Sequence, residues 1–459
     1  MKSLYTRLVS GFLFPIHERL KGHDTVRVRT DMESSQWLDQ EEIVALQVEK
    51  LRQFLSDVAR HVPCYRSLFA KLNFSPADIH ELKDLQLLPL TDKSFVRANL
   101  DQLKADNAIN LSRFNTGGSS GEPLIFYIGK TRISHDVAAK WRATRWWDVD
   151  LGDPEIVVWG SPIELGAQDR LRQLRDWAFR TRLLPAFEMS ERKLDGFVRE
   201  IRDMRPKMLF GYPSALSLIA AHAQRRGIKM DDIGVKAAFV TSERLYDHQR
   251  EKIETVFGCP VANGYGGRDA GFIAHQCTQG GMHITAEDII VEIIDRDGKV
   301  LPKGEEGEIV VTHLATGEFP FIRYRTGDIG VLGDVSCACG RGLPLLKEIQ
   351  GRTTDLIVAQ DGTVLHGLAL IYVLRDLPGI REFKVIQESL EQTRIQVVRE
   401  EGFQQDFDTL IKREFRKRLG QGVRIVTEYC DEISKEKSGK HRYVTSHVNS
   451  NSFPQPTDN

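Results

Sequence analysis

Short apolar runs alternate with amphipathic helical segments through the middle of the chain, and this alternation restricts the fold more than any other feature. In chain order, the runs and the segments after them are 156–159, 170–180, 208–210, 215–226, 237–240 and 248–257. Apolar residues in the longer segments recur at helical spacing. Strand–helix alternation of this kind predicts a mostly parallel sheet covered by helices on both faces. The expected fold class is therefore α/β.

The pattern changes near residue 285 and again near residue 351. Over 285–350, apolar runs are joined by turn signals such as Asp297-Gly298, which favours a small, more antiparallel β unit. Strands and helices then follow in an order that suits a compact α+β domain. We predict a large N-terminal domain over 1–350 that includes the β unit, a small C-terminal domain over 351–448, and a disordered tail over 449–459.

Charge and hydropathy argue against several classes of function. The formal net charge is −1, so no overall field attracts nucleic acid. No apolar stretch approaches the ~20 residues that a transmembrane helix needs. Six cysteines in a chain without an export signal predict reduced thiols and a cytoplasmic location.

The first apolar segment, 8–16, follows Lys2 and Arg7 and faintly resembles a signal peptide. Serine, glycine and proline interrupt it, and no small-x-small cleavage site follows before His17. We expect an amphipathic segment that packs on the body of the protein. A peripheral membrane contact is the alternative, although one short apolar face binds an interface only weakly.

A segment rich in glycine and hydroxyl groups, Asn115 to Pro123, is the first candidate for ligand binding. Its glycines allow close approach of the backbone, and successive N–H groups and hydroxyls can wrap a polyphosphate as an anion nest. No Walker A lysine follows. A plain surface turn is the alternative, because Gly/Ser clusters usually mark loops. The candidate ligands are Thr116, Gly117, Gly118, Ser119, Ser120 and Gly121.

Four later motifs follow this loop in a fixed order. They are Tyr265-Gly266-Gly267-Arg268-Asp269, Tyr324-Arg325-Thr326-Gly327-Asp328, Gly351-Arg352-Thr353-Thr354-Asp355 and Ser438-Gly439-Lys440. Together with the loop they resemble the AMP-forming (adenylate-forming) ligase superfamily, from about residue 40 to about residue 447. Within it the chain resembles the phenylacetate–CoA ligase-like and capsule-biosynthesis-associated branch. The resemblance implies that the small C-terminal domain is mobile.

The resemblance also implies how the larger domain binds ATP. The ring of Tyr265, followed by Gly266, would pack on adenine, and the acid at Asp269 would hold the Mg²⁺ of bound ATP. Asp328 would accept hydrogen bonds from both ribose hydroxyls. Ser242-Glu243, at the end of an apolar run, resembles the turn that contacts adenine in the family. An ordinary helix cap explains this pair equally well.

The C-terminal motifs resemble the family's hinge and its catalytic lysine. Arg352 would contact the nucleotide, and Asp355 would be the hinge between the two domains. Lys440 would stabilise charge at the α-phosphate as pyrophosphate leaves. By itself, Lys440 would be read as an exposed lysine in a basic tail.

The sequence departs from the family's pattern in three of these motifs. Leu124 stands where a lysine often follows the loop's proline, and Thr354 replaces the first of two acids in the hinge. Arg268 and Asp269 replace threonine and glutamate. A shorter carboxylate still suits Mg²⁺, and Arg268 could offset the phosphate charge that the first loop leaves unpaired.

The resemblance implies a two-step reaction with ATP, Mg²⁺ and coenzyme A. A small-molecule carboxylic acid would be activated to an acyl-AMP with release of pyrophosphate, and the acyl group would then pass to coenzyme A. Tyr212, Pro213 and Ser214 are candidate walls of the acid pocket. One alternative is transfer to an amine, a sugar or a carrier protein in polysaccharide biosynthesis. Another is a catalytically lapsed nucleotide-binding scaffold. The sequence leaves a homodimer open.

A second constellation is separate from this reaction. Cys277 and His283 precede the β unit's core, and Cys337 and Cys339 follow it. Three thiolates and one imidazole make a closed ligand set for tetrahedral structural zinc. The glycines around them favour a metal knuckle, whereas buried free cysteines are the alternative.

Overall fold

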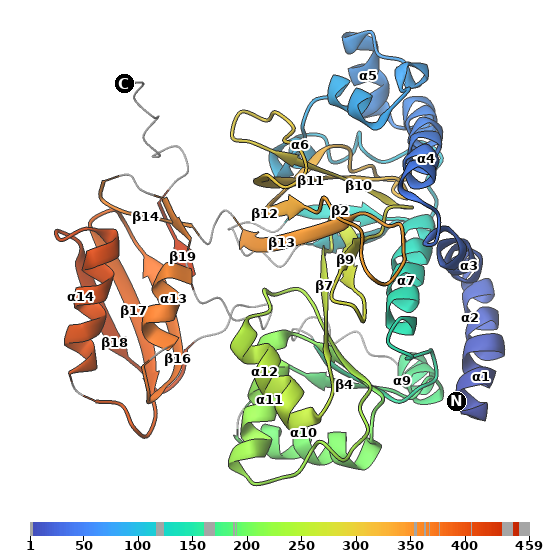
Figure 1. Ribbon diagram of the computed structural model, residues 1–459. Helices are drawn as coiled ribbons and strands as arrows, with labels where there is room; N and C mark the ends of the chain where they lie inside the picture. The colour runs from blue at the N-terminus through green and yellow to red at the C-terminus, as the bar shows by residue number, and fades with distance from the viewer. Residues whose placement is uncertain are drawn as a thin grey trace. The chain divides into compact units, whose positions relative to one another are not determined.

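The computed structural model describes residues 3–115, 124–159, 170–186, 189, 191–352, 356–361, 364–366, 368–375, 377–404, 406–433 and 444–448. The chain divides into two compact units, Met1–Gln350 and Gly351–Asn459 (Figure 1). An 11-stranded sheet lies in the larger unit and a four-stranded sheet in the smaller.

Parallel strands form one half of the large sheet, in the order β7-β6-β5-β3-β4. Their bounds are β3 (Glu155–Trp159), β4 (Thr181–Pro185), β5 (Met208–Gly211), β6 (Ala237–Val240) and β7 (Val261–Gly267). Every residue of β5 and β6 is buried. Strands buried on both faces read as unbroken apolar runs, which is why the sequence pattern located them.

Helices cover both faces of this parallel half. The helices are α7 (Lys130–Arg145), α9 (Arg170–Ala178), α10 (Glu191–Met204), α11 (Pro213–Arg225) and α12 (Asp247–Phe257). Residues of α10, α11 and α12 pack on Ala238, whereas Ala143 of α7 packs with Phe239. Because successive side chains of a strand point to opposite faces, these two neighbours in β6 face different helical layers. The predicted α/β fold class is confirmed.

Strand β7 joins this half to an antiparallel half. It pairs in parallel with β6 and antiparallel with β8, and Figure 1 shows it running between the two groups of strands. The order continues as β8-β9-β13-β12-β11-β10. The bounds are β8 (Gly271–Gln276), β9 (Met282–Ile284), β10 (Ile289–Ile294), β11 (Glu306–His313), β12 (Tyr324–Leu332) and β13 (Leu345–Arg352). The antiparallel region therefore begins before residue 285 and shares β7 with the parallel half.

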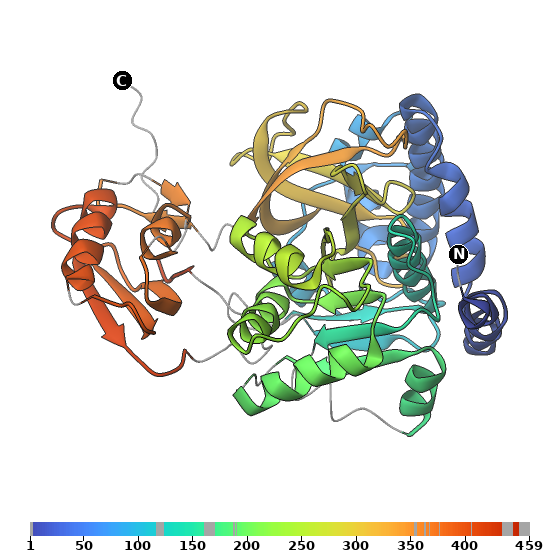
Figure 2. The same ribbon diagram turned by 60° about the horizontal axis from the view of Figure 1, so that its bottom comes forward.

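Helices dominate the N-terminal part, and the first of them, up to residue 61, lie along one edge of the larger unit (Figure 2). They are α1 (Leu4–Leu8), the π-helical η1 (Val9–Leu13), α2 (Phe14–Lys21), α3 (Thr25–Ser35), α4 (Gln40–His61), α5 (Pro63–Leu72), the 3₁₀ turns η2 (Pro76–Asp78) and η3 (Leu82–Leu87), and α6 (Lys93–Ala98). Asp39 and Glu42 form a capping box that starts α4. The helix ends before Val62, because the residue before a proline is disfavoured in the helical region. A separate antiparallel pair, β1 (Ser112–Asn115) and β2 (Ile125–Ile128), follows.

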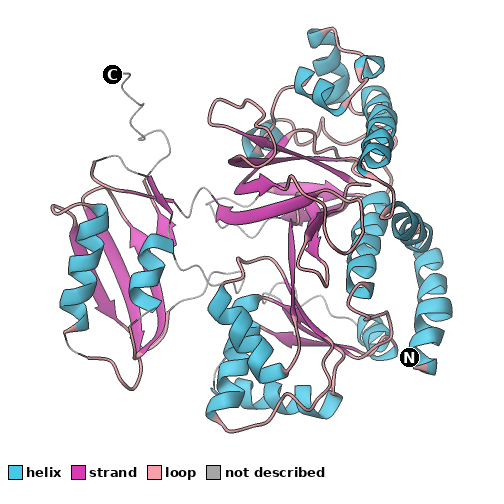
Figure 3. Cartoon of the chain, in the orientation of Figure 1, coloured by secondary structure: helices cyan, strands magenta, loops and turns pink. Residues whose placement is uncertain are grey.

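The smaller unit is α+β, and the helices α13 and α14 lie beside its sheet (Figure 3). The sheet order is β18-β17-β16-β19, and β14 pairs with β15 separately. The bounds are β14 (Leu356–Val358), β15 (Val364–His366), α13 (Leu368–Arg375), β16 (Ile380–Gln387), β17 (Gln392–Arg399), α14 (Phe407–Leu419), β18 (Arg424–Tyr429) and β19 (Val444–Ser446). Phe407, Ile411, Phe415 and Leu419 of α14 are all buried. This spacing of four gives the helix one apolar face toward the sheet.

In the part of the chain that the structure describes, no helix is long and apolar enough to cross a membrane.

A fully buried ion pair ties α7 to α3 and to the loop before β10. Arg142 Nη1 lies 2.5 Å from Glu287 Oε1 and 3.3 Å from the carbonyl of Met32. Ser35 donates a hydrogen bond to the same Glu287 oxygen at 2.8 Å. The Arg142 and Glu287 side chains are only 1% and 2% exposed. Removing one partner would leave the other as an uncompensated charge in the interior.

We expect Arg142→Met to lower the free energy of unfolding of the larger unit by about 3–5 kcal/mol, because Glu287 would stay buried without its partner. Arg27 provides a matched control, since its pairs with Asp24 and Asp31 are exposed. Arg27→Met should cost less than about 1 kcal/mol. Chemical denaturation followed by circular dichroism measures the free energy of unfolding of both variants. An equal loss in the two variants would show that the buried ion pair contributes no more to stability than the exposed one.

Candidate functional site

The ends of the parallel strands bring Ser242 and Glu243 next to helix α11. Ser242 follows β6 with a left-handed backbone (φ 70°), which is uncommon for a residue with a Cβ. Glu243 then reaches the neighbouring strand's loop, where its Oε2 accepts a hydrogen bond from the N–H of Ser214 at 3.3 Å. Ser214 lies in the first turn of α11, where the helix dipole favours a carboxylate. Glu243 therefore caps α11, a helix distant from it in sequence.

The three predicted pocket-wall residues lie together at this helix start but differ in burial. The ring of Tyr212 is stacked on Trp159, with centroids 4.3 Å apart and planes at 24°, and it belongs to the core. Pro213 is also buried, whereas Ser214 is half-buried. Ser214 is thus the member of the three with surface left to contact a small molecule. The role of all three as a pocket wall stays a prediction.

Tyr265 and Asp328 meet although 63 residues separate them in sequence. Tyr265 lies in β7, and its hydroxyl donates to Asp328 Oδ2 at 2.9 Å. Asp328 lies inside β12, where Gly327 has a φ of 75° and the Asp328 N–H donates to Thr326 Oγ1. Both side chains are partly exposed. An aromatic ring and a carboxylate are therefore presented together, as recognition of a purine and its ribose requires.

Arg268 and Asp269 form the tight turn between β7 and β8. The strand register shifts between Tyr265 and Gly266, which marks a β-bulge of the kind that redirects side chains. A Cβ on Gly266 would lie 2.2 Å from the carbonyl oxygen of Gly271, so only glycine fits there. The hydroxyl of Tyr324 donates to Asp269 Oδ2 at 2.8 Å. The Asp269 carboxylate is thereby held toward β12, the strand that carries Asp328.

Arg132, on α7, supports this turn from behind. Its Nη1 donates to the carbonyl of Asp269 at 2.9 Å and its Nη2 to that of Arg268 at 2.6 Å. Asp136 lies one helical turn away, with Oδ2 3.4 Å from Arg132 Nε. Burial by itself raises the pKa of Asp136, but Arg132 and His313 together hold it below its usual value. The half-buried Asp136 carboxylate therefore stays charged beside the buried Arg132 guanidinium, which fixes the backbone of the turn.

The roles of Arg132 and Tyr324 are not apparent from the sequence. Tyr324 belongs to the Tyr324–Asp328 motif, but the motif does not reveal that its hydroxyl contacts Asp269. A single arginine inside a helical segment carries no pattern that distinguishes it from a surface arginine, and only its 1% exposure identifies it.

Several predicted residues lie outside the described residues. These are the loop ligands Thr116, Gly117, Gly118, Ser119, Ser120 and Gly121, the hinge residue Asp355, and Lys440. The backbone of Arg352 is placed at the end of β13. The roles of these residues stay predictions from the sequence.

The four predicted metal ligands do converge. The ligand atoms of Cys277, His283, Cys337 and Cys339 all lie within 4.8 Å of one another. The sulfurs of Cys277 and Cys337 are 3.6 Å apart, and Cys339 Sγ is 3.1 Å from His283 Nε2. These sulfurs are too far apart for a disulfide.

The backbone around the cluster suits metal binding. Gly280 N–H donates to the carbonyl of Cys277, and Gly340 N–H to that of Cys337, so each cysteine begins a tight turn. His283 Nδ1 faces the carbonyl of Leu343 at 3.3 Å, which leaves Nε2 toward the sulfurs. Burial lowers the pKa of His283 to about 4. A ligating histidine usually has such a carbonyl partner for its other nitrogen.

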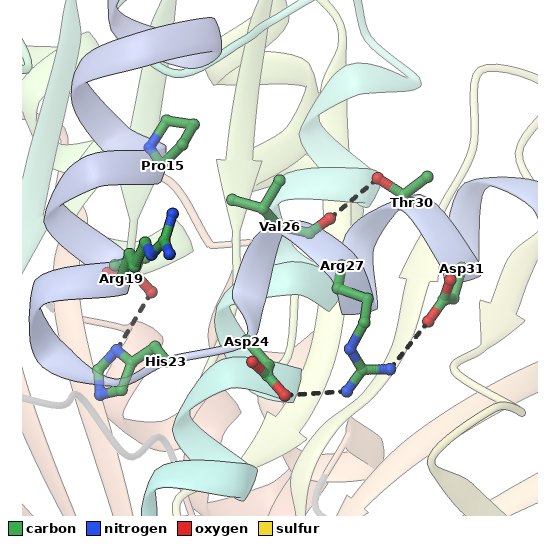
Figure 4. A pocket seen from close by; sticks show the side chains of 9 residues that line it. Pro15, Arg19, His23, Asp24, Val26, Arg27, Thr30 and Asp31 are labelled. Atoms are coloured by element: carbon green, nitrogen blue, oxygen red, sulfur yellow. Dashed lines mark hydrogen bonds and ion pairs between the residues drawn. The ribbon is translucent and has the colours of Figure 1, made fainter.

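A shallow pocket of about 440 Å³ lies apart from these motifs, between α2 and α3 (Figure 4). The side chain of Arg27 lines the pocket and forms ion pairs with Asp24 and Asp31. The pocket is lined by Pro15, Glu18, Arg19, His23, Asp24, Val26, Arg27, Thr30 and Asp31. None of the motif residues contributes to it.

Two families match separate parts of the chain. Residues 182–316 match the AMP-binding enzyme family, and residues 357–447 match the CapK C-terminal domain. The first stretch contains Ser242, Tyr265 and Asp269. Asp328 lies between the two matched stretches.

Related proteins match over most of the chain. A phenylacetate-coenzyme A ligase of Thermus thermophilus is 25% identical, over 75% of this chain and 77% of its own length. Protein CapK of Staphylococcus aureus is 21% identical, over 89% of this chain and 90% of its own. A crystal structure of 2-hydroxyisobutyryl-CoA ligase in the postadenylation state has a TM-score of 0.72 at 20% identity, covering 91% of this chain and 92% of that one. This likeness shows the fold, and with the two family matches and the relatives it leads to one conclusion: the chain belongs to the adenylate-forming ligase superfamily, in its phenylacetate–CoA ligase-like branch.

Proposed function

We propose that the chain is an AMP-forming acid–CoA ligase. A carboxylate oxygen of the acid attacks the α-phosphorus of ATP, the bond to the β-phosphate breaks, and pyrophosphate leaves. The sulfur of coenzyme A then attacks the acyl carbon, and AMP leaves with the mixed-anhydride oxygen. The observation that carries the proposal is the contact of Tyr265 with Asp328. Tyr265 lies just beyond the last parallel pair of β6 with β7, Val240 with Asn263, and so next to the carboxyl ends of the parallel strands, where α/β sheets collect their ligands. The phenylacetate-coenzyme A ligases among the relatives support the same reaction.

Among the described residues, different side chains would bind different parts of the ATP–Mg²⁺ complex. The Asp328 carboxylate has two acceptor oxygens for the ribose hydroxyls, and the Tyr265 hydroxyl orients it. The Asp269 carboxylate, aimed by Tyr324 and backed by Arg132, is a hard oxygen ligand of the type that Mg²⁺ requires. Bound Mg²⁺ would neutralise charge on the phosphates. Positioning and charge stabilisation supply most of the catalysis in such a reaction.

A different acyl acceptor is the second candidate. The CapK C-terminal domain match covers most of the smaller unit, and Protein CapK spans more of this chain than the coenzyme A ligases do. Transfer to an amine or a sugar in capsular polysaccharide biosynthesis would follow the same adenylation step. The cytoplasmic location and the homodimer stay predictions from the sequence.

We expect carboxylate-dependent exchange of pyrophosphate into ATP with a panel of aryl, fatty, hydroxy and amino acids. Lys440→Ala should abolish the exchange, because the charge at the α-phosphate would lose its partner. Products analysed with and without coenzyme A then identify the acceptor. Exchange without thioester formation would favour the amine or sugar acceptor. Nucleotide binding without any exchange would contradict the enzymatic proposal.

Tyr265→Phe should raise the KM for ATP by up to about tenfold and change kcat less, because Asp328 would lose the hydrogen bond that orients it. Tyr5→Phe is the matched control, since its hydroxyl also donates a hydrogen bond, to the carbonyl of Ala178. Steady-state kinetics at varied ATP measure both variants. An unchanged KM in Tyr265→Phe would show that the Asp328 carboxylate needs no such support.

We further propose that Cys277, His283, Cys337 and Cys339 hold structural zinc. Tetrahedral zinc with Zn–S bonds of about 2.3 Å sets its sulfurs about 3.8 Å apart, close to the 3.6 Å between Cys277 and Cys337. The ligands come from the end of β8, from β9 and from the loop between β12 and β13. A metal here would join three segments of the antiparallel half.

The purified protein should contain about one zinc per chain, as a closed four-ligand site predicts. Cys339→Ser should release the metal and lower the unfolding midpoint, because three segments would lose their common anchor. Cys430→Ser, in the smaller unit, is the control and should keep the full metal content. Elemental analysis and thermal unfolding give the two readouts. The site would be ruled out if the purified protein contained no metal and a chelator left its unfolding midpoint unchanged.

A further inference from the structure

The first helical run of the chain, Leu4–Lys21, exposes a row of large apolar side chains. Every fourth residue takes part, and we call this set the outer row. Its members and their exposed fractions are Leu4 (85%), Leu8 (48%), Phe12 (57%), Ile16 (43%) and Leu20 (83%). Scattered single apolar residues on a surface are ordinary, whereas a continuous apolar row is not.

The opposite face of the same run is fixed to the body of the larger unit. Thr6 Oγ1 donates to Asp153 Oδ1 at 2.7 Å, and the Tyr5 hydroxyl donates to the carbonyl of Ala178 at 2.7 Å. The ring of Phe14 lies edge-on to Trp141 at 5.1 Å. The run therefore already has its packing partner, and the outer row is directed away from it.

A π-helical turn keeps the outer row aligned. In an α-helix with 3.6 residues per turn, every fourth residue drifts by about 40° around the axis, so a row of five would spread over about 160°. The turn η1 (Val9–Leu13) lies in the middle of the run. Each residue of a π turn rotates the chain less than in an α turn, so this segment reverses part of the drift. Such turns occur often at functional positions.

The exposed charged side chains of the run itself are positive, and the exposed Asp24 and Asp31 of the next helix pair with Arg27. Arg7, Arg19 and Lys21 are exposed, and none of them has a carboxylate partner among the described residues. Glu18 is the acidic residue of the run, but it is buried and accepts hydrogen bonds from Thr25 and the neighbouring histidines. The exposed face of the run thus combines apolar side chains with unpaired cations.

Helix α9 lies next to the run and also exposes large apolar side chains. Its last residue, Ala178, accepts the Tyr5 hydrogen bond, and Arg180 stacks on the Tyr5 ring at 4.0 Å. Trp177 is 74% exposed and Leu174 is 61% exposed. Tryptophan is favoured at the boundary between lipid and water, because its ring is both apolar and polar.

We propose that this face binds peripherally to an anionic lipid bilayer, with the Leu4–Lys21 run lying in the plane of the interface. Apolar side chains would enter the boundary of the acyl region, and Arg7, Arg19 and Lys21 would contact anionic headgroups. A second copy of the chain is a poorer occupant, since a two-fold contact would set the same cations against one another. The proposal does not depend on which acid the enzyme activates.

The test is flotation of the full-length protein with vesicles of phosphatidylcholine, with and without phosphatidylglycerol. Binding should require phosphatidylglycerol and weaken as salt rises. Phe12→Glu should reduce the bound fraction by at least about tenfold, because an apolar contact becomes a charge of the wrong sign. Ile109→Glu is the matched control, since Ile109 is 74% exposed and apolar but lies outside the run.

A second variant tests the electrostatic part alone. Arg7→Glu with Arg19→Glu should lose binding to anionic vesicles while circular dichroism shows the folded protein. Equal binding of all variants, or no binding of the parent protein, would overturn the proposal. Light scattering tests the alternative that a second copy of the chain binds the outer row. If the parent protein is a dimer and Phe12→Glu is a monomer, the outer row is a contact between copies and not a membrane-binding face.

Discussion

Strand β7 pairs in two different ways along its length, and the larger unit depends on this change. Its first residues pair in parallel with β6, up to Asn263, and its later residues pair antiparallel with β8, from Gly264 onward. A parallel sheet must be covered by helices on both faces, whereas an antiparallel one need not be. The change of pairing therefore divides the unit into two kinds of packing. Tyr265 follows the change directly, so the residue that contacts Asp328 stands where the two halves meet.

Helix α7 provides the charged support for that junction. Two of its side chains, Arg132 and Arg142, are among the largest fully buried side chains of the described chain. Arg132 holds the carbonyls of the β7–β8 turn, and Arg142 holds Glu287 before β10. Apolar side chains would fill the same space, but they would leave these carbonyl and carboxylate groups without donors. The helix thus positions loops through hydrogen bonds that a purely apolar interface lacks.

The cysteine–histidine cluster acts on the same half of the sheet. It connects the end of β8, strand β9 and the loop before β13, and β8 pairs with β7 while the loop follows β12. The strands that carry Tyr265 and Asp328 are therefore neighbours of the cluster's segments. A bound metal would restrict the motion of both strands without touching the nucleotide. The outer row has a different position in the architecture, because it belongs to helices packed outside the sheet.

The types and approximate bounds of the elements could be predicted from the amino-acid pattern, because hydrophobic periodicity is a local property. The helical segment predicted over 248–257 is α12 (Asp247–Phe257), and the apolar run 237–240 is β6. The order of the motifs along the chain was also enough to identify the family. The roles of Lys440, Asp355 and the loop from Thr116 to Gly121 rest on that resemblance alone.

Which side chains meet became visible only in the folded chain. The contacts of Tyr265 with Asp328, of Tyr324 with Asp269 and of Arg132 with Asp269 span 63, 55 and 137 residues. Such contacts depend on strand order, register and one bulge, and none of these follows from a local pattern. The spacing of Cys277, His283, Cys337 and Cys339 allowed a metal site, but the pairing of β9 with β13 brings them together. The outer row was visible as apolar residues in the sequence, and the packing of the opposite face decided that it points outward.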